Sequence, residues 1–402
     1  MENRHLNRPG VTMSVQALKD RIYALLPHIE AGAAARERDR QLPYEAVRAL
    51  AQAGLFTLRV PEAAGGPGAS VRDVIEVLLA VASVDSNTAQ ALRPGLAFLE
   101  GLLTGAEDDA GSERDRWFAR YLDGAVLGNA GWEVGGANGA ISARIVRQGD
   151  HYRVTGSKYY STGALYADWI SVVALDEDDQ PRSFVLPRDR QGLVLLDDFD
   201  AMGQRLTASG TTRLDDVIVY PDELRARTVQ EGTRTIVTPF LQLFLATVQA
   251  GIARNALNDA VRFARDHARP IKHSSASRSV DDPYVELSVG EIAARAYAAE
   301  AVVLRAADTI DRAWAAGQDP ALVEQAAVEV AQAQFITADS ALKAAERVFD
   351  VGGASTTSRQ HNLDRHWRNA RTVTNHNPRD WKAAAVGAWA LKGTPPPTSG
   401  LF

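Results

Sequence analysis

The spacing of hydrophobic residues divides the chain into three zones. In residues 1–123 they recur at three- and four-residue steps, which predicts amphipathic helices. In residues 124–232 the period changes to two, which predicts short β-strands. In residues 233–402 long helical patterns return. We therefore expect an α+β fold of three domains: an N-terminal helical domain, a central β-domain and a C-terminal helical bundle.

The first zone contains one well-marked helix and one glycine-rich loop. The helix opens at Leu42-Pro43-Tyr44, with proline in its first turn, and Gly54 ends it. The loop Gly65-Gly66-Pro67-Gly68 is interpreted as a turn. It does not match a phosphate-binding loop, because no Gly-Lys-Ser/Thr follows it.

The second zone reads as a compact β-domain or barrel. Ile141–Arg147 and Tyr152–Lys158 alternate in polarity around the Gly149-Asp150 turn, which predicts a hairpin. Three further strands are expected at Trp169–Leu175, Ser183–Leu186 and Thr212–Val219.

The third zone predicts long, closely packed helices. One apolar stripe runs from Val285 to Ile310 and a second from Ala326 to Phe349. Many stripe residues are alanines, which allow helices to approach closely, so we expect a bundle of about four helices that also favours contacts between subunits.

Composition excludes several classes of protein. The 402 residues carry a formal charge of −6 with no dominant basic cluster, which argues against nucleic-acid binding. The absence of cysteine excludes disulfides, thiolate metal sites and cysteine nucleophiles. Met1–Asp20 lacks an apolar signal core, and the run Pro239–Ala253 is too short to span a bilayer. We expect a cytoplasmic protein without a membrane partner, and no metal, since the eight histidines show no ligand spacing.

Several motifs, taken in order, resemble the acyl-CoA dehydrogenase superfamily over nearly the whole chain. The late ones resemble its flavin-dependent monooxygenase branch, which includes dibenzothiophene monooxygenase and the sulfur-acquisition oxidoreductases. The motifs are Gly54-Leu55-Phe56, Val60-Pro61-Glu62, Tyr159-Tyr160-Ser161-Thr162-Gly163, Gly203-Gln204-Arg205-Leu206-Thr207-Ala208-Ser209-Gly210-Thr211, Leu363-Asp364-Arg365-His366-Trp367-Arg368-Asn369-Ala370-Arg371-Thr372 and His376-Asn377-Pro378.

The resemblance implies an acyl-CoA dehydrogenase-like fold with a central β-barrel domain and a C-terminal four-helix bundle, assembled as a homotetramer. Flavin would lie between the β-domain and the bundle. Enzymes of this branch take reduced FMN from a separate NAD(P)H-dependent flavin reductase, react it with O2 and transfer one oxygen atom. FAD remains possible as the cofactor.

The chain lacks the base that a dehydrogenase needs. Removing a proton next to a thioester requires a carboxylate held over the substrate. The aligned position is about Asn377, and the second family location, in Phe240–Leu257, also has no carboxylate. Asp259 lies just beyond that stretch and is interpreted as a solvated helix residue.

Oxygen transfer through a flavin C4a-hydroperoxide needs hydrogen-bond donors and protection from water. Asn129, Ser161 and His376 stand at the family-matching positions and are the candidate catalytic residues. The resemblance also assigns flavin contacts to Asn129, Ser161, Ser209, Gly210 and Thr211, and places Arg269 on the flavin phosphate, often across a subunit interface.

Two residues of the late motif have competing interpretations. Arg368 is a candidate flavin contact, but it also suits a role in holding the C-terminal loop. His366 is expected to be structural, through packing and a backbone hydrogen bond. The chain also departs from its family: histidines found in relatives near Arg93 and at Val373 are absent here.

The sequence therefore predicts a two-component monooxygenase that oxygenates a small organosulfur compound at sulfur. The alternatives are an N- or aromatic-ring hydroxylase of the same branch, an acyl-CoA dehydrogenase with an unrecognised base, and a scaffold that has lost its flavin.

Overall fold

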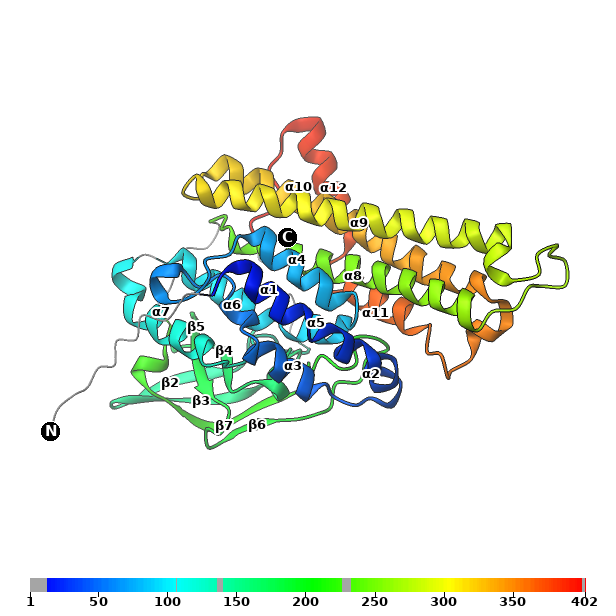
Figure 1. The fold of residues 1–402 in the computed structure, drawn as a ribbon. Helices are drawn as coiled ribbons and strands as arrows, with labels where there is room; N and C mark the ends of the chain where they lie inside the picture. The colour runs from blue at the N-terminus through cyan, green and yellow to red at the C-terminus, as the bar shows by residue number, and fades with distance from the viewer. Residues whose placement is uncertain (1–12, 106, 136–139, 226–232, 400–401) are drawn as a thin grey trace.

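The computed structural model describes residues 13–105, 107–135, 140–225, 233–399 and 402. Its order is helices, strands, helices (Figure 1). The N-terminal helices are α1 (Val15–Tyr23), α2 (Leu26–Asp39), α3 (Tyr44–Gln52), α4 (Val71–Ala82), α5 (Ser86–Ala91), α6 (Arg93–Thr104) and α7 (Glu107–Leu122). The expected helix before Gly54 is confirmed as α3, and Gly54 adopts a left-handed φ of 93°.

The strands form one mixed seven-stranded sheet in the order β1-β4-β2-β3-β7-β6, with β5 pairing β4. This sheet corresponds to the predicted β-barrel domain. Its members are β1 (Leu127–Ala130), β2 (Arg144–Gln148), β3 (His151–Lys158), β4 (Trp169–Leu175), β5 (Pro181–Pro187), β6 (Leu193–Leu195) and β7 (Thr212–Val219).

The predicted hairpin is confirmed as the antiparallel pair β2–β3, in which Arg147 lies opposite Tyr152. The strands expected at Trp169–Leu175 and Thr212–Val219 have these bounds in the structure. Sequence analysis did not predict β1 and β6. The pairing of β1 with β4 is parallel, so no tight turn between neighbouring strands marks it.

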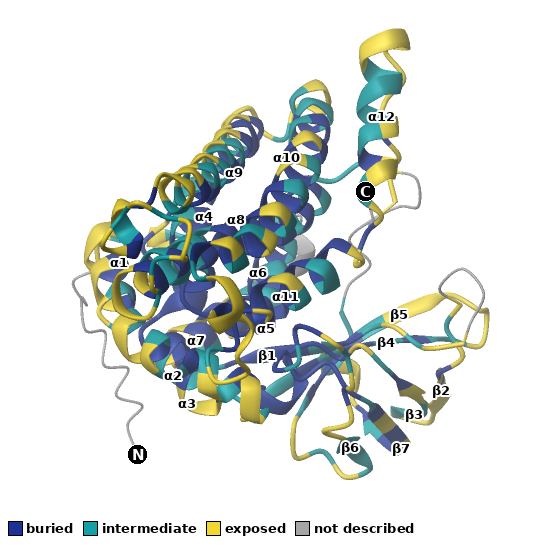
Figure 2. Cartoon of the chain, turned by 90° about the vertical axis from the view of Figure 1, so that its right-hand side faces the viewer, coloured by how far each residue is buried: buried dark blue, intermediate teal, exposed yellow. Residues whose placement is uncertain are grey.

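The C-terminal helices are α8 (Val237–Asp266), α9 (Pro283–Ala315), α10 (Pro320–Arg347), α11 (Arg365–Thr374) and α12 (Arg379–Lys392). Helices α8, α9 and α10 pack on one another, α4 covers α8 and α9, and α11 lies against α8 and α10. The run Pro239–Ala253 is the buried face and interior of α8. Figure 2 shows α12 standing out from the rest of the bundle.

One predicted domain boundary lies within the described residues, and the other lies at the edge of a segment outside them. Helix α7 ends at Leu122 and β1 begins at Leu127, so the boundary at 123/124 lies in the connection between them. The boundary at 232/233 touches residues 226–232, which lie outside the described residues. Among the described residues, no helix combines the length and apolar character that crossing a bilayer requires.

Candidate flavin site

Asn129 and Ser161 are brought together by the sheet and the turn that follows β3. The backbone N–H of Asn129, in β1, donates to the carbonyl of Thr162 at 3.2 Å. Ser161 is 1% exposed, and its own N–H donates to the carbonyl of Gly210 at 3.3 Å. Main-chain hydrogen bonds therefore bring together Asn129, Ser161 and Gly210, three predicted site residues that lie far apart along the chain.

The side-chain oxygens of Asn129 and Ser161 are buried without a hydrogen-bond partner among the described residues. Buried polar atoms in native proteins are normally satisfied, so such orphans indicate a ligand or water partner. A carbonyl oxygen accepts and a hydroxyl can do both, which matches the alternating N–H and C=O groups on the polar edge of a flavin ring. The residues present fit a flavin.

The segment Ser209-Gly210-Thr211 lies beside this pair but is held by protein partners. The Ser209 hydroxyl shares hydrogen bonds with Thr162 at 3.0 Å and Thr207 at 2.7 Å. Thr211 donates from both its backbone N–H and its hydroxyl to Asp198, each at 2.7 Å. A Cβ at Gly210 would stand 2.4 Å from Asp198 Oδ1, so glycine is required for this close approach. Only its backbone is left to approach a ligand.

His376 lies in the connection between α11 and α12, where its N–H donates to the carbonyl of Val373 at 3.1 Å. The ring is exposed, yet protein surrounds it on most sides, and Arg93 lies near enough for its charge to act on the imidazole. The enclosing protein and this cation both lower the pKa of His376. Solvent contact reduces this lowering of the His376 pKa without reversing it, so the imidazole is neutral at pH 7.

Arg368 makes protein contacts that saturate its guanidinium. It donates to Glu37 at 2.5 and 3.0 Å, to Asp364 at 2.8 Å and to Asn362 at 2.9 Å. Glu37 is 1% exposed, and the Arg368 cation holds its carboxyl pKa below the usual value. These contacts suit the structural interpretation of Arg368, since they fasten α11 to α2.

Arg269 lies far from the residues described so far. It follows the end of α8, is exposed, and has no polar partner among the described residues. Figure 1 places this connection at the far end of the bundle from the sheet. A single chain therefore does not bring Arg269 to Asn129 and Ser161.

The structure corrects two expectations about the late motif. Asp259 is not a solvated helix residue: its side chain is 12% exposed and accepts from Arg365 at 2.5 Å and from His366 at 2.9 Å. His366 is structural, but its partner is this carboxylate rather than a backbone group. The burial of Asp259 could not be predicted from its neighbours in sequence, because the groups that enclose it come from α11, more than a hundred residues further along the chain.

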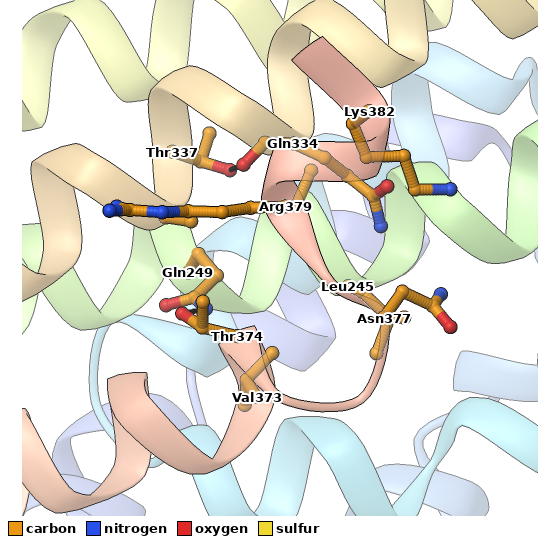
Figure 3. A pocket seen from close by; sticks show the side chains of 11 residues that line it. Leu245, Gln249, Gln334, Thr337, Val373, Thr374, Asn377, Arg379 and Lys382 are labelled. Atoms are coloured by element: carbon orange, nitrogen blue, oxygen red, sulfur yellow. Dashed lines mark hydrogen bonds between the residues drawn. The ribbon is translucent and has the colours of Figure 1, made fainter. Parts of the chain in front are cut away.

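A pocket of about 290 Å³ opens between α8, α10, α11 and α12 (Figure 3). It contains none of the predicted flavin contacts, but Asn377 lines it, and this side chain donates to Gln242 Oε1 at 2.6 Å. Gln249 lies beside Thr374, to which it donates at 2.7 Å. No aspartate or glutamate is among the described residues that line it, which are Leu245, Ala246, Gln249, Gln334, Thr337, Ala338, Val373, Thr374, Asn377, Arg379 and Lys382.

Sequence reasoning missed two cations near His376, Arg93 and Lys382. Lys382 is 2% exposed, and burial lowers its pKa to about 7. The sequence does mark Arg93 as unusual, because it is a charged residue within the apolar stretch Ala91–Leu96 at the start of α6. Compared with relatives, that position is marked only by the absence of their histidine.

Comparisons with known proteins cover the three zones in turn. Residues 16–121, 132–217 and 243–381 match the N-terminal, middle and C-terminal domains of acyl-CoA dehydrogenase. Among curated relatives, the chain is similar to dibenzothiophene monooxygenase from Mycolicibacterium goodii, with 31% identity over 85% of this chain and 86% of the relative.

Two further similarities concern FMN-dependent proteins. A probable FMNH2-dependent monooxygenase, SfnC, from Pseudomonas putida is 31% identical over 87% of this chain and 89% of the relative. The crystal structure of FMN-bound TdsC from Paenibacillus sp. A11-2 superposes with a TM-score of 0.89, with 28% identity over 96% of this chain and 100% of that one.

Proposed function

The chain belongs to the acyl-CoA dehydrogenase superfamily and, within it, to the flavin-dependent monooxygenase branch, and from that premise we propose a two-component enzyme that uses reduced FMN and O2 to oxygenate a small organosulfur compound. The names of its relatives support FMN over FAD and sulfur as the atom oxygenated. One oxygen atom enters the substrate and the other leaves as water, with both electrons drawn from the reduced flavin.

The observation that carries the proposal is the chemistry of the loop before α12. Where a dehydrogenase holds its base, this chain has Asn377, an amide without useful basicity that is hydrogen-bonded to Gln242. The described residues around the adjoining pocket add no carboxylate. A sulfur lone pair attacks electrophilic oxygen without first losing a proton, so sulfur oxygenation needs no base on the enzyme.

Asn129, Ser161 and His376 have different roles in the proposed reaction. Asn129 and Ser161 would hold the polar edge of the flavin with their otherwise unsatisfied oxygens. When bound, reduced FMN would supply the two electrons that O2 needs, in a place that these two residues and His376 would shield and hydrogen-bond. The neutral imidazole of His376 offers one N–H donor and one acceptor, which suits it to stabilise developing negative charge and return a proton.

The proposal includes two kinds of partner. A separate NAD(P)H-dependent reductase supplies the reduced flavin, as the FMNH2-dependent name of the Pseudomonas putida relative suggests. The proposal includes a cytoplasmic location for both proteins. Other copies of the chain complete a homotetramer, since large apolar side chains on α9 and α12 are exposed. They are Tyr284, Leu287, Tyr297, Trp381 and Leu391.

Rapid mixing of the protein–reduced FMN complex with oxygen tests the proposal. We expect a C4a-hydroperoxide absorbance that lasts for seconds, and His376→Ala should shorten its lifetime by about tenfold or more. His28→Ala is the matched control, because His28 is an exposed histidine of α2 far along the chain from the site. Immediate reoxidation of FMN by the wild type, without an intermediate, would contradict the proposal.

A panel of substrates then separates the remaining alternatives. Sulfides and sulfoxides should be oxygenated in preference to amines and phenols. An acyl-CoA with an artificial electron acceptor and no O2 should give no turnover, and turnover there would establish a dehydrogenase with an unrecognised base.

A further inference from the structure

Arg93 is a half-buried cation to which the described residues offer no polar partner. It is the first residue of α6, and its guanidinium has no hydrogen bond or ion pair within the described part of the chain. Two other enclosed arginines are paired: Arg59 donates to Glu100 at 2.7 Å, and Arg365 donates to Asp259 at 2.5 Å. Withdrawing a charge from water without a counter-ion is costly, so an unpaired arginine in such a place indicates an anionic ligand.

The start of α6 packs against the turn that carries Ser161. A Cβ on Gly163 would stand 2.6 Å from the carbonyl oxygen of Ala91 and 3.7 Å from Cγ of Pro94, which flank Arg93 closely in sequence. Helix α6 also contacts α8 and β1. The charge of Arg93 acts in turn on His376, in the connection between α11 and α12. Arg93 therefore lies in the same region as the proposed flavin contact and the proposed proton donor.

Two cationic side chains act on His376. The charges of Arg93 and Lys382 both lower its pKa, although Lys382, whose own pKa burial lowers to about 7, is only partly protonated at pH 7. Burial lowers the pKa of Arg93 itself to about 10, which leaves the guanidinium charged at pH 7. A neutral compound gains nothing from such a field, whereas an anion is attracted by it.

We propose that Arg93 binds an oxyanion on the substrate, so that the preferred substrates are organosulfur compounds carrying a carboxylate, sulfinate or sulfonate group. A planar guanidinium presents two parallel N–H donors that match the two oxygens of such a group. The inference rests on the proposed function, because it specifies the substrate of that same site. It separates this chain from relatives named for dibenzothiophene, a compound without charge.

Equilibrium titration of the oxidised FMN-loaded protein tests the inference without requiring turnover. The probes are (methylthio)acetate and its uncharged methyl ester, which share the thioether. The wild type should bind the acid about tenfold or more tightly than the ester. Arg93→Gln should abolish this preference and Arg93→Lys should keep part of it. Arg359→Gln, which removes an exposed charge elsewhere, is the matched control and should leave the preference unchanged.

Two results would overturn the inference. One is equal affinity of the wild type for acid and ester, or a preference that survives in Arg93→Gln. The other is an Arg93→Gln variant that loses FMN affinity while keeping the preference, which would assign the guanidinium to the flavin. Thermal unfolding of each variant checks that it is folded. Failure of the proposed function looks different, since it would leave the anion preference intact while no oxygenated product forms.

Discussion

At the residue scale, the polar residues of the motif Leu363–Thr372 mainly hold α11 against α2 and α8. Asp259 of α8 accepts from Arg365 and His366 of α11, and Glu37 of α2 accepts from Arg368. These buried ion pairs orient α11, and the connection that follows it carries His376. The motif thus positions the candidate proton donor through the helix that precedes it.

Asp259→Asn should destabilise the protein by about 3 kcal/mol at pH 7, because it leaves the enclosed Arg365 cation without its counter-ion. Arg365 and His366 hold the pKa of Asp259 below the ordinary value of 3.8. A carboxyl with a lowered pKa in the folded state contributes stability above its unfolded pKa and loses it as the pH falls through the folded value.

Urea unfolding of wild type and Asp259→Asn should therefore show a constant difference between pH 5 and 8, which shrinks below about pH 4. Asp266→Asn is the control, since Asp266 is exposed at the end of the same helix. A difference below about 0.5 kcal/mol at pH 7 would mean that Asp259 is solvated after all.

At the element scale, α8 organises the molecule, because α4, α9, α10 and α11 all pack against it. Gly251 marks a close approach of α8 to α4: a Cβ there would stand 2.3 Å from the Cβ of Ala82. The glycine is needed for packing, although glycine is otherwise unfavourable within a helix.

Gly251→Ala should destabilise the protein by about 1–3 kcal/mol, since α4 and α8 would have to separate. Gly290→Ala in α9 is the matched comparison, because a Cβ at Gly290 meets nothing within 4 Å. There the higher helix propensity of alanine should stabilise by about 0.5–1 kcal/mol. Chemical denaturation measures both, and a similar effect at the two positions would contradict the packing interpretation.

At the scale of the whole molecule, our proposal divides the flavin site between subunits. Asn129 lies in β1 and Ser161 in the turn after β3, whereas Arg269 belongs to the connection after α8, which lies at the end of the bundle away from the sheet (Figure 1). A flavin held by both groups requires a neighbouring copy. Cofactor affinity is then coupled to assembly by mass action.

Subunit mixing tests this division. Arg269→Ala should lose phosphate binding, and Ser161→Leu should block the ring site, so each homo-oligomer should bind FMN at least about tenfold more weakly. Co-assembled subunits should recover part of the wild-type capacity, because some sites combine an intact sheet with an intact Arg269. Titration by FMN fluorescence measures the recovery, and its absence in verified mixed oligomers would contradict a shared site.

Several elements could be predicted because their signals are local. The β2–β3 hairpin follows from alternating polarity around Gly149-Asp150, and the end of α3 from Gly54. Strands β1 and β6 could not be found in this way. They have four and three residues, too few to show a period, and β1 exists only through its pairing with β4 some forty residues later.

The sequence by itself determined the order of helices, strands and helices, the family, and the lack of a carboxylate at Asn377, because periodicity and residue identity are properties of neighbours along the chain. Only the tertiary structure decided that Asp259 is enclosed, that Arg368 is paired with Glu37, and that Arg93 has no partner among the described residues. Burial and charge pairing depend on residues brought together from distant positions, and no local pattern records them.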